Sequence, residues 1–119
     1  MKILVPTSGI VPAQEKAEYI LDIAKRLKAD VTVIHILDLG EGSEGEEALT
    51  FFSELGAKKD VKVTTYLKEG NVVPTIVDFA ESENASMIVM GASEGRIVAE
   101  WIVTDVIDKT KIPVVIIPR

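Results

Sequence analysis

Residues 87–95 read MIVMGASEG and residues 113–117 read PVVII, with a helical stretch between them. The first segment is an apolar strand that runs into a turn carrying Gly91 and Gly95. A strand, a turn, a helix and a second strand in this order are typical of a βαβ unit with parallel strands. In open α/β sheets such glycine turns commonly hold phosphate groups, because glycine lets backbone N–H groups approach an anion and a helix N-terminus favours negative charge.

The rest of the chain alternates strands and helices in the same way. Apolar and alternating segments predict strands at residues 2–6, 31–37, 61–67, 86–90 and 114–117, and helices at residues 12–29, at 44–55, after residue 71, and at 93–110. Strict alternation predicts a five-stranded parallel sheet with right-handed crossovers and helices on both faces, in the strand order 3-2-1-4-5. The switch point of this Rossmann-like α/β fold lies between strands 1 and 4. Residues 7–9 and 91–95 are therefore expected to face each other across one cleft.

Local signals predict where several elements begin and end. Pro12 is expected to start the first helix, Gly56 to end the second, and Asn71 to cap the third. The first helix carries an apolar stripe that is expected to cover the sheet: Ala13, Ala17, Ile20, Ala24 and Leu27. Residues 61–67 alternate between apolar and polar side chains, as in an edge strand.

Composition limits the classes of protein that this chain can be. Its 119 residues, 47% of them hydrophobic, suit a single domain over residues 1–119. The absence of cysteine excludes disulfides, thiolate catalysis and Cys-based zinc sites. The net charge of −6 argues against nucleic acid as a partner. No apolar run is long enough for a membrane span and the amino end lacks a leader pattern, so we expect a cytoplasmic protein without membrane contact.

Five short motifs follow one another along the chain: KILVPT at residues 2–7, HILD at 35–38, EGN at 69–71, MIVMG at 87–91 and PVVII at 113–117. In their order and spacing they resemble the universal stress protein family over the whole chain. The resemblance implies a five-stranded parallel sheet of the adenine nucleotide alpha hydrolase-like architecture and a role in stress response. For one branch of the family it also implies ATP bound in the cleft between strands 1 and 4.

The resemblance assigns seven positions to this nucleotide cleft: Pro6, Thr7, Ser8, Ile36, Met90, Gly91 and Gly95. Two of them differ in residue type from ATP-binding members. Ser8 stands where those members carry an Asp that contacts adenine, and Ile36 stands where a Val lines the base pocket.

The phosphate-binding segment departs further from the family pattern. ATP-binding members carry Gly-x2-Gly-x9-Gly followed by Ser or Thr, whereas here three residues separate Gly91 from Gly95. Glu100 and Trp101 take the places of the last Gly and Ser, and Trp101 is expected to plug the cleft or join the core. A carboxylate close to a triphosphate would cost on the order of several kcal/mol. We therefore predict a vestigial cleft with no cofactor and little or no ATP binding. The alternative is an ATP- or AMP-binding switch, with Mg²⁺ bridging Glu100 to the phosphates.

Catalytic chemistry has few candidates in this chain. His35 is the only histidine, and because it lies within an apolar strand we expect it to be buried and hydrogen bonded. A general-base role is the alternative. The turn at Thr7, Ser8 and Gly9 is expected to be structural, and its alternative is a small hydrolase that uses Ser8 as nucleophile. We expect a regulatory or protective protein that acts through a protein partner and is not an enzyme.

The last strand would form an exposed apolar edge in the predicted strand order. Such an edge promotes aggregation unless it is paired or covered. Pairing with a second copy across a two-fold axis removes this hazard, and the family resemblance implies the same arrangement. We therefore predict a homodimer through Val114, Val115, Ile116 and Ile117.

Overall fold

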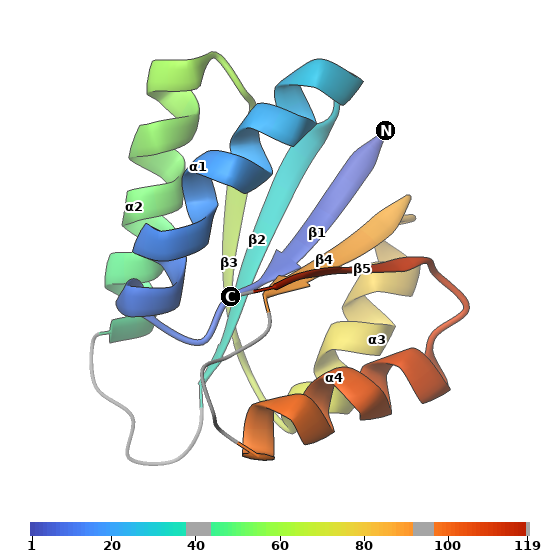
Figure 1. Ribbon diagram of the computed structural model, residues 1–119. Coiled ribbons are helices and arrows are strands. Elements are labelled where there is room, and N and C mark those ends of the chain that lie inside the picture. The colour runs from blue at the N-terminus through green and yellow to red at the C-terminus, as the bar shows by residue number, and fades with distance from the viewer. Residues whose placement is uncertain (38–43, 92–96, 119) are drawn as a thin grey trace.

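Five parallel strands form one sheet in the order β3-β2-β1-β4-β5, as predicted (Figure 1). The computed structural model describes residues 1–37, 44–91 and 97–118, with side chains described from residue 45 and from residue 102 in the last two ranges. The strands are β1 (Lys2–Pro6), β2 (Asp30–Leu37), β3 (Val63–Glu69), β4 (Met87–Gly91) and β5 (Val114–Ile117). The helices are α1 (Ile10–Leu27), α2 (Glu44–Lys59), α3 (Val72–Ser82) and α4 (Ile97–Lys109).

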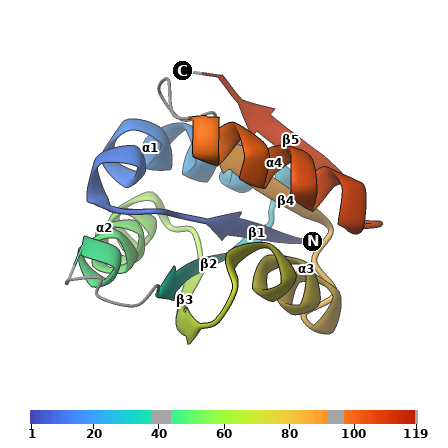
Figure 2. The same cartoon turned by 90° about the horizontal axis from the view of Figure 1, so that it is seen from below.

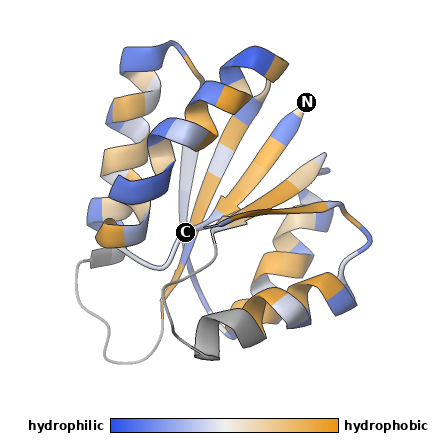
Figure 3. Ribbon diagram, in the orientation of Figure 1, coloured by the Kyte–Doolittle hydropathy of each residue, from blue (hydrophilic) through white to orange (hydrophobic). Residues whose placement is uncertain are grey.

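The sheet is buried between two helical layers (Figure 2). Helices α1 and α2 cover one face, where Val33 and Phe52 are among the fully buried side chains. Helices α3 and α4 cover the other face, where Leu4 and Ile76 are equally buried. Figure 3 shows strands that are hydrophobic along much of their length between helices of mixed hydropathy. Successive residues of the inner strands thus enter different layers, as expected for a parallel sheet buried on both faces. In the described residues no helix combines the length and apolarity needed to cross a membrane.

Three helices end in the same way, on a residue other than glycine in the left-handed conformation. These residues are Lys28, Asp60 and Asn84, with φ of 55°, 59° and 52°. The buried residue that follows each of them (Ala29, Val61 and Ala85) donates its N–H to the carbonyl five residues earlier (Ala24, Gly56 and Ala80) at 2.9, 2.9 and 3.0 Å. This is the long bond of a Schellman motif, which satisfies a carbonyl at the helix end.

The prediction that Gly56 ends the second helix is wrong. Helix α2 continues through Gly56 to Lys59, and Asp60 takes the terminating role. Gly56 serves packing instead, because a Cβ added there would overlap Val63 Cγ2 and lie 3.0 Å from the Val61 carbonyl oxygen. The absence of a side chain therefore lets α2 lie close to the start of β3.

Two other helix starts differ in detail from the sequence prediction. Helix α1 begins at Ile10, so Pro12 is its third residue and not its first. A proline is tolerated there because the first-turn N–H groups have no acceptor within the helix. Asn71 does precede α3, but its side chain makes no capping hydrogen bond. Its backbone carbonyl accepts from the Thr75 N–H at 3.1 Å instead.

The apolar stripe of α1 is confirmed except at its last member. Ala13, Ala17, Ile20 and Ala24 are buried, whereas Leu27 is 43% exposed. Leu27 is the last residue of the helix. It lines a hollow between α1 and the outer strands instead of packing in the core.

Strand β3 lies at one edge of the sheet, as predicted, and pairs with β2. It starts at Val63, two residues later than expected, because Val61 closes the end of α2. Leu67 is 40% exposed, while the Tyr66 ring packs edge-on against Phe79 with centroids 4.9 Å apart. The larger aromatic side chain thus takes the packed position on this edge.

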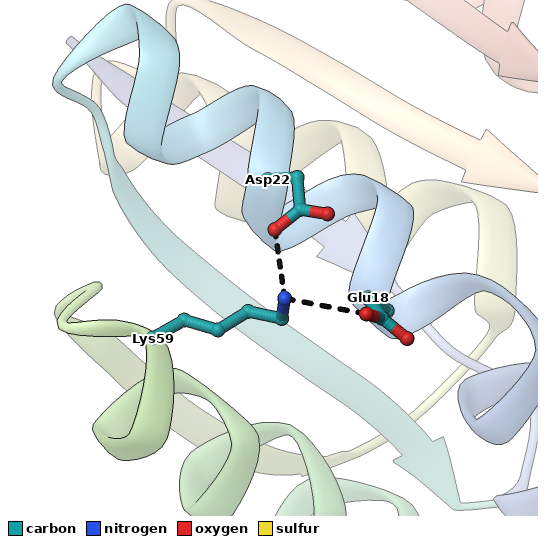
Figure 4. A network of polar contacts seen from close by, with 3 residues as sticks. All are labelled: Glu18, Asp22 and Lys59. Carbon is teal, nitrogen blue, oxygen red and sulfur yellow. Dashed lines mark hydrogen bonds and ion pairs between the residues drawn. The ribbon is translucent and has the colours of Figure 1, made fainter.

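A surface network joins α1 to the end of α2 (Figure 4). Lys59 Nζ donates to Asp22 Oδ1 at 2.8 Å and lies 3.5 Å from Glu18 Oε1. The hydrogen bond with Asp22 raises the pKa of Lys59 above its usual value. Stability from this network is therefore present at neutral pH and is lost only as the pH rises through the raised pKa.

We expect Gly56→Ala to destabilise the protein although alanine is the better helix former. Overpacking costs about 1–3 kcal/mol, which exceeds the propensity gain of about 1 kcal/mol. Urea unfolding followed by circular dichroism measures the change. Ser53→Ala, at an exposed position of the same helix, is the control and should shift the free energy of unfolding by less than about 0.5 kcal/mol. A Gly56→Ala variant as stable as the parent would contradict the close contact of α2 with β3.

Candidate functional site

The predicted cleft lies where β1 and β4 part. Their ladder reaches Leu4↔Ile88. By contrast, β1 remains paired with β2 as far as Pro6↔Ile34, and β4 continues against β5 to Gly91. The carboxyl ends of β1 and β4 therefore reach the same edge of the sheet beyond their shared ladder. This is the position at which open α/β sheets bind ligands.

The turn after β1 is held by backbone bonds and presents one serine. The Thr7 N–H donates to the Ile34 carbonyl at 2.9 Å, which extends the contact with β2 one residue past the strand. The Thr7 hydroxyl donates to the Gly9 carbonyl at 3.4 Å. Pro6 and Thr7 are half-buried, whereas Ser8 is exposed. The turn is thus anchored on the β2 side, and the Ser8 side chain is accessible.

His35 connects β2 to this turn. Its side chain is 2% exposed, and its Nδ1 lies 2.8 Å from the Thr7 carbonyl oxygen. Because a carbonyl only accepts, Nδ1 carries the hydrogen and donates it. Another edge of the ring packs on Gly45 in the first turn of α2, where an added Cβ would overlap Cδ2 and Nε2. The prediction of a buried, hydrogen-bonded histidine is confirmed, and this side chain joins three segments.

Ile36 and Met90 lie in the same layer of the structure, between the sheet and helices α3 and α4. They are 8% and 7% exposed and belong to the apolar cluster beneath α3 and α4. Each lies one residue before the end of its strand, β2 or β4. The two side chains expected to line a base pocket therefore come together on the same face of the sheet, near its carboxyl edge.

Gly91 is covered by a lysine from α1. A Cβ added at Gly91 would lie 2.5 Å from Lys16 Cδ and 2.6 Å from Lys16 Cε. The Lys16 ammonium continues past the glycine and donates to the Pro118 carbonyl at 3.2 Å. The methylene stem of Lys16 thus fills the space beside Gly91, and its charge sits at the carboxyl ends of β4 and β5.

Part of the predicted site falls on residues that the structure does not describe. Gly95 lies outside the described residues, and so do the side chains of Glu100 and Trp101. The expectations about the phosphate segment at these positions stay predictions.

An acidic hollow of about 420 Å³ adjoins the start of α1. It is lined by Ile10, Glu46, Glu47, Thr50, Phe51 and Glu54. Three carboxylates at this place lower the electrostatic potential next to the β1 turn, which disfavours a polyphosphate. Across residues 1–37, 44–91 and 97–118 no group of three or more His, Asp or Glu side chains is placed to hold a metal ion.

A larger apolar hollow of about 770 Å³ runs between α1 and the outer strands. Its lining includes Tyr19, Ile23, Leu27, Met87, Val115 and Ile117. Tyr19 and Val115 remain 57% and 42% exposed. The hollow, here called the α1–β5 groove, reaches β5, which is the last strand of the sheet and pairs with β4.

The five-stranded parallel sheet, with a switch point beside β1 and a glycine at the end of β4, defines a Rossmann-like α/β domain. The chain belongs to the universal stress protein family, whose sequence model matches residues 1–118. A universal stress protein of Methanocaldococcus jannaschii is 31% identical over 99% of this chain and 82% of its own length. These matches confirm the resemblance found in the sequence motifs.

Solved structures show the same fold. A universal stress family protein from Burkholderia pseudomallei has a TM-score of 0.80 at 20% identity, covering 99% of this chain and 96% of its own. The universal stress protein from Archaeoglobus fulgidus, solved in complex with dAMP, has a TM-score of 0.79 at 25% identity, covering 98% and 97%. Both confirm the fold.

Sequence reasoning missed Lys16 and Gly45 as parts of this region. Lys16 lies between the small residues Ala13 and Ala17, which bring α1 close to the sheet, and this spacing is the only signal that its stem is held there. Gly45 lies in the acidic stretch at residues 41–47, whose composition is typical of a solvated loop that leads into a helix. Its packing partner, His35, is ten residues away on another element, so no local pattern indicates the contact.

We expect His35→Phe to lower the free energy of unfolding by about 1–3 kcal/mol, because the ring stays while the donor to the Thr7 carbonyl is lost. The turn at residues 7–9 should also exchange its amide hydrogens faster. Urea unfolding and hydrogen exchange measure the two effects.

The matched control is Ile34→Val, which removes one buried methyl group from the adjacent position. It should cost about 0.5–1.5 kcal/mol and leave exchange in the turn unchanged. Unaltered exchange at residues 7–9 in His35→Phe would show that the histidine does not hold the turn.

Proposed function

We propose that this chain is a cytoplasmic, non-catalytic regulatory or protective protein of the stress response. In this proposal it forms a homodimer through β5, acts through a protein partner, and has a nucleotide cleft that binds little or no ATP. The observation that carries the proposal is the position of Lys16. Its stem occupies the space beside Gly91 that a backbone phosphate cradle would need to keep open.

Electrostatics and chain length support weak binding of a triphosphate. Glu100 stands in the sequence where ATP-binding relatives carry a phosphate-contacting glycine, and the hollow beside the β1 turn is lined by three glutamates. The alignment with the Methanocaldococcus relative is 139 positions long, whereas this chain has 119 residues, so the alignment contains gaps in this chain. The relative therefore carries internal segments that this chain lacks, as expected if connections such as the one after β4 are shortened.

A second candidate function is binding of a nucleoside monophosphate in the same cleft. The Archaeoglobus fulgidus relative was solved in complex with dAMP. In this chain five of the predicted cleft residues lie within one residue of the carboxyl end of β1, β2 or β4: Pro6, Thr7, Ile36, Met90 and Gly91. A single phosphate needs fewer contacts than a triphosphate. The shortened segment after β4 should therefore weaken binding of a monophosphate less than binding of ATP.

Isothermal titration calorimetry with ATP and Mg²⁺ separates these possibilities. We expect no binding of ATP with a dissociation constant below about 1 mM, a weak affinity that corresponds to roughly −4 kcal/mol. Titration with AMP under the same conditions tests the second candidate. Micromolar binding of Mg²⁺-ATP would overturn the proposed weak-binding cleft.

The dimer part of the proposal rests on the outer edge of the sheet. Strand β5 pairs with β4 and presents Val115 and Ile116 at 42% and 38% exposure. The sequence of β5 contains neither a charge nor a proline, the two devices that commonly protect an edge. The adjoining α1–β5 groove adds apolar surface that a second copy would cover.

We expect Val115→Lys to convert the dimer to a folded monomer, because two-fold pairing would bring unpaired ammonium groups into an apolar contact. Sedimentation velocity gives the mass, and circular dichroism checks folding. The matched control is Ile107→Lys on α4, at 49% exposure. It should remain dimeric. A monomeric parent protein, or a Val115→Lys variant that dimerises as well as the parent, would refute pairing through β5.

A further inference from the structure

We propose that Lys16 is the phosphate-contacting residue of the cleft, and that it binds the single phosphate of a nucleoside monophosphate. This inference rests on the second candidate function above. It assigns the contact to a residue of α1, whereas the family pattern places phosphate contacts in the glycine segment after β4.

The position of Lys16 supports this role. Its stem lies along Gly91, the last residue of β4, and the ammonium reaches the level of Pro118, just past the end of β5. Both points are at the carboxyl edge of the sheet. Gly91 ends β4, which borders the switch point where ligands of this fold bind, and Pro118 lies one strand further out, so Lys16 also lines the α1–β5 groove. The stem packs beside Gly91, so part of its side-chain entropy is already lost before a ligand binds.

Within the residues that the structure describes, the charge of Lys16 has no anionic partner. Its hydrogen-bond partner is the neutral carbonyl of Pro118, and within the described part of the chain no carboxylate lies within ion-pair distance of its Nζ. Three other described lysines, by contrast, have their charge paired with a carboxylate: Lys2, Lys59 and Lys109. Exchanging an exposed carbonyl for a phosphate oxygen replaces a neutral acceptor by a charged one, which roughly doubles the strength of the bond.

One cation also sets a limit on the ligand. An ammonium neutralises part of the charge of one phosphate group, but the nearby Glu15 and the acidic hollow at the start of α1 add negative charge. Each further phosphate would bring more charge without a further described cation at Gly91. The arrangement thus fits a monophosphate better than a di- or triphosphate.

The test compares AMP with adenosine by isothermal titration calorimetry on the full chain at 0.15 M ionic strength, where surface charges are screened beyond about 8 Å. We expect the parent protein to bind AMP about tenfold more tightly than adenosine, the value of one charge-assisted hydrogen bond. Lys16→Met retains an apolar stem for Gly91 and removes the charge. In this variant the ratio of the affinity for AMP to the affinity for adenosine should fall close to one. The affinity for adenosine should stay within about twofold of the parent value.

Two controls isolate the position of the charge. Lys25→Met removes an exposed lysine from the same helix, and Glu15→Gln removes the neighbouring charge that lines the α1–β5 groove. Lys25→Met should keep the parent preference for AMP, and Glu15→Gln should keep or raise it. If Lys16→Met preserves the preference, the assignment to Lys16 is refuted while nucleotide binding stands. If the parent binds neither compound, the monophosphate function fails and the assignment fails with it.

Discussion

Burial of β1 on both faces is the constraint on which the rest of the structure depends. Ile3, Leu4 and Val5 are at most 3% exposed, and they alternate between the two apolar layers. A central strand buried in this way needs helices above and below the sheet, so the chain must wind outward in one direction through β2 and β3 and in the other through β4 and β5. The reversal of direction beside β1 creates the switch point, which is where the nucleotide cleft is predicted.

Two side chains near the carboxyl edge of the sheet are held by backbone carbonyls of the protein. His35 donates to the Thr7 carbonyl, and Lys16 donates to the Pro118 carbonyl. The first bond supports the turn after β1, and the ring that makes it packs on Gly45. The second is exposed and can be exchanged at little cost. The carboxyl edge of the sheet therefore combines a turn held by a buried histidine with a lysine whose ammonium contacts an exposed carbonyl.

Most of the fold could be predicted from the sequence because its signals are local and repeated. Apolar strands separated by amphipathic helices specify the element order, and parallel topology leaves few arrangements of the strands. The prediction for the end of α2 was wrong because glycine is common both at helix ends and at close contacts between elements. Glycine is typical of helix ends, but Gly56 lies inside α2, where β3 approaches too closely for a side chain. Helix ends at Lys28, Asp60 and Asn84 were not predicted, since residues other than glycine rarely adopt the left-handed conformation.

The sequence by itself determined the alternating α/β architecture, the strand order, the burial of His35 and membership of the universal stress protein family. All of these follow from periodicity and short motifs within neighbouring residues. Only the tertiary structure decided that Lys16 covers Gly91, that Gly45 packs on the His35 ring, and that Leu27 lines a groove outside the core. These contacts join residues far apart in the chain, and they depend on ångström-scale distances between a helix and a strand that no local pattern encodes.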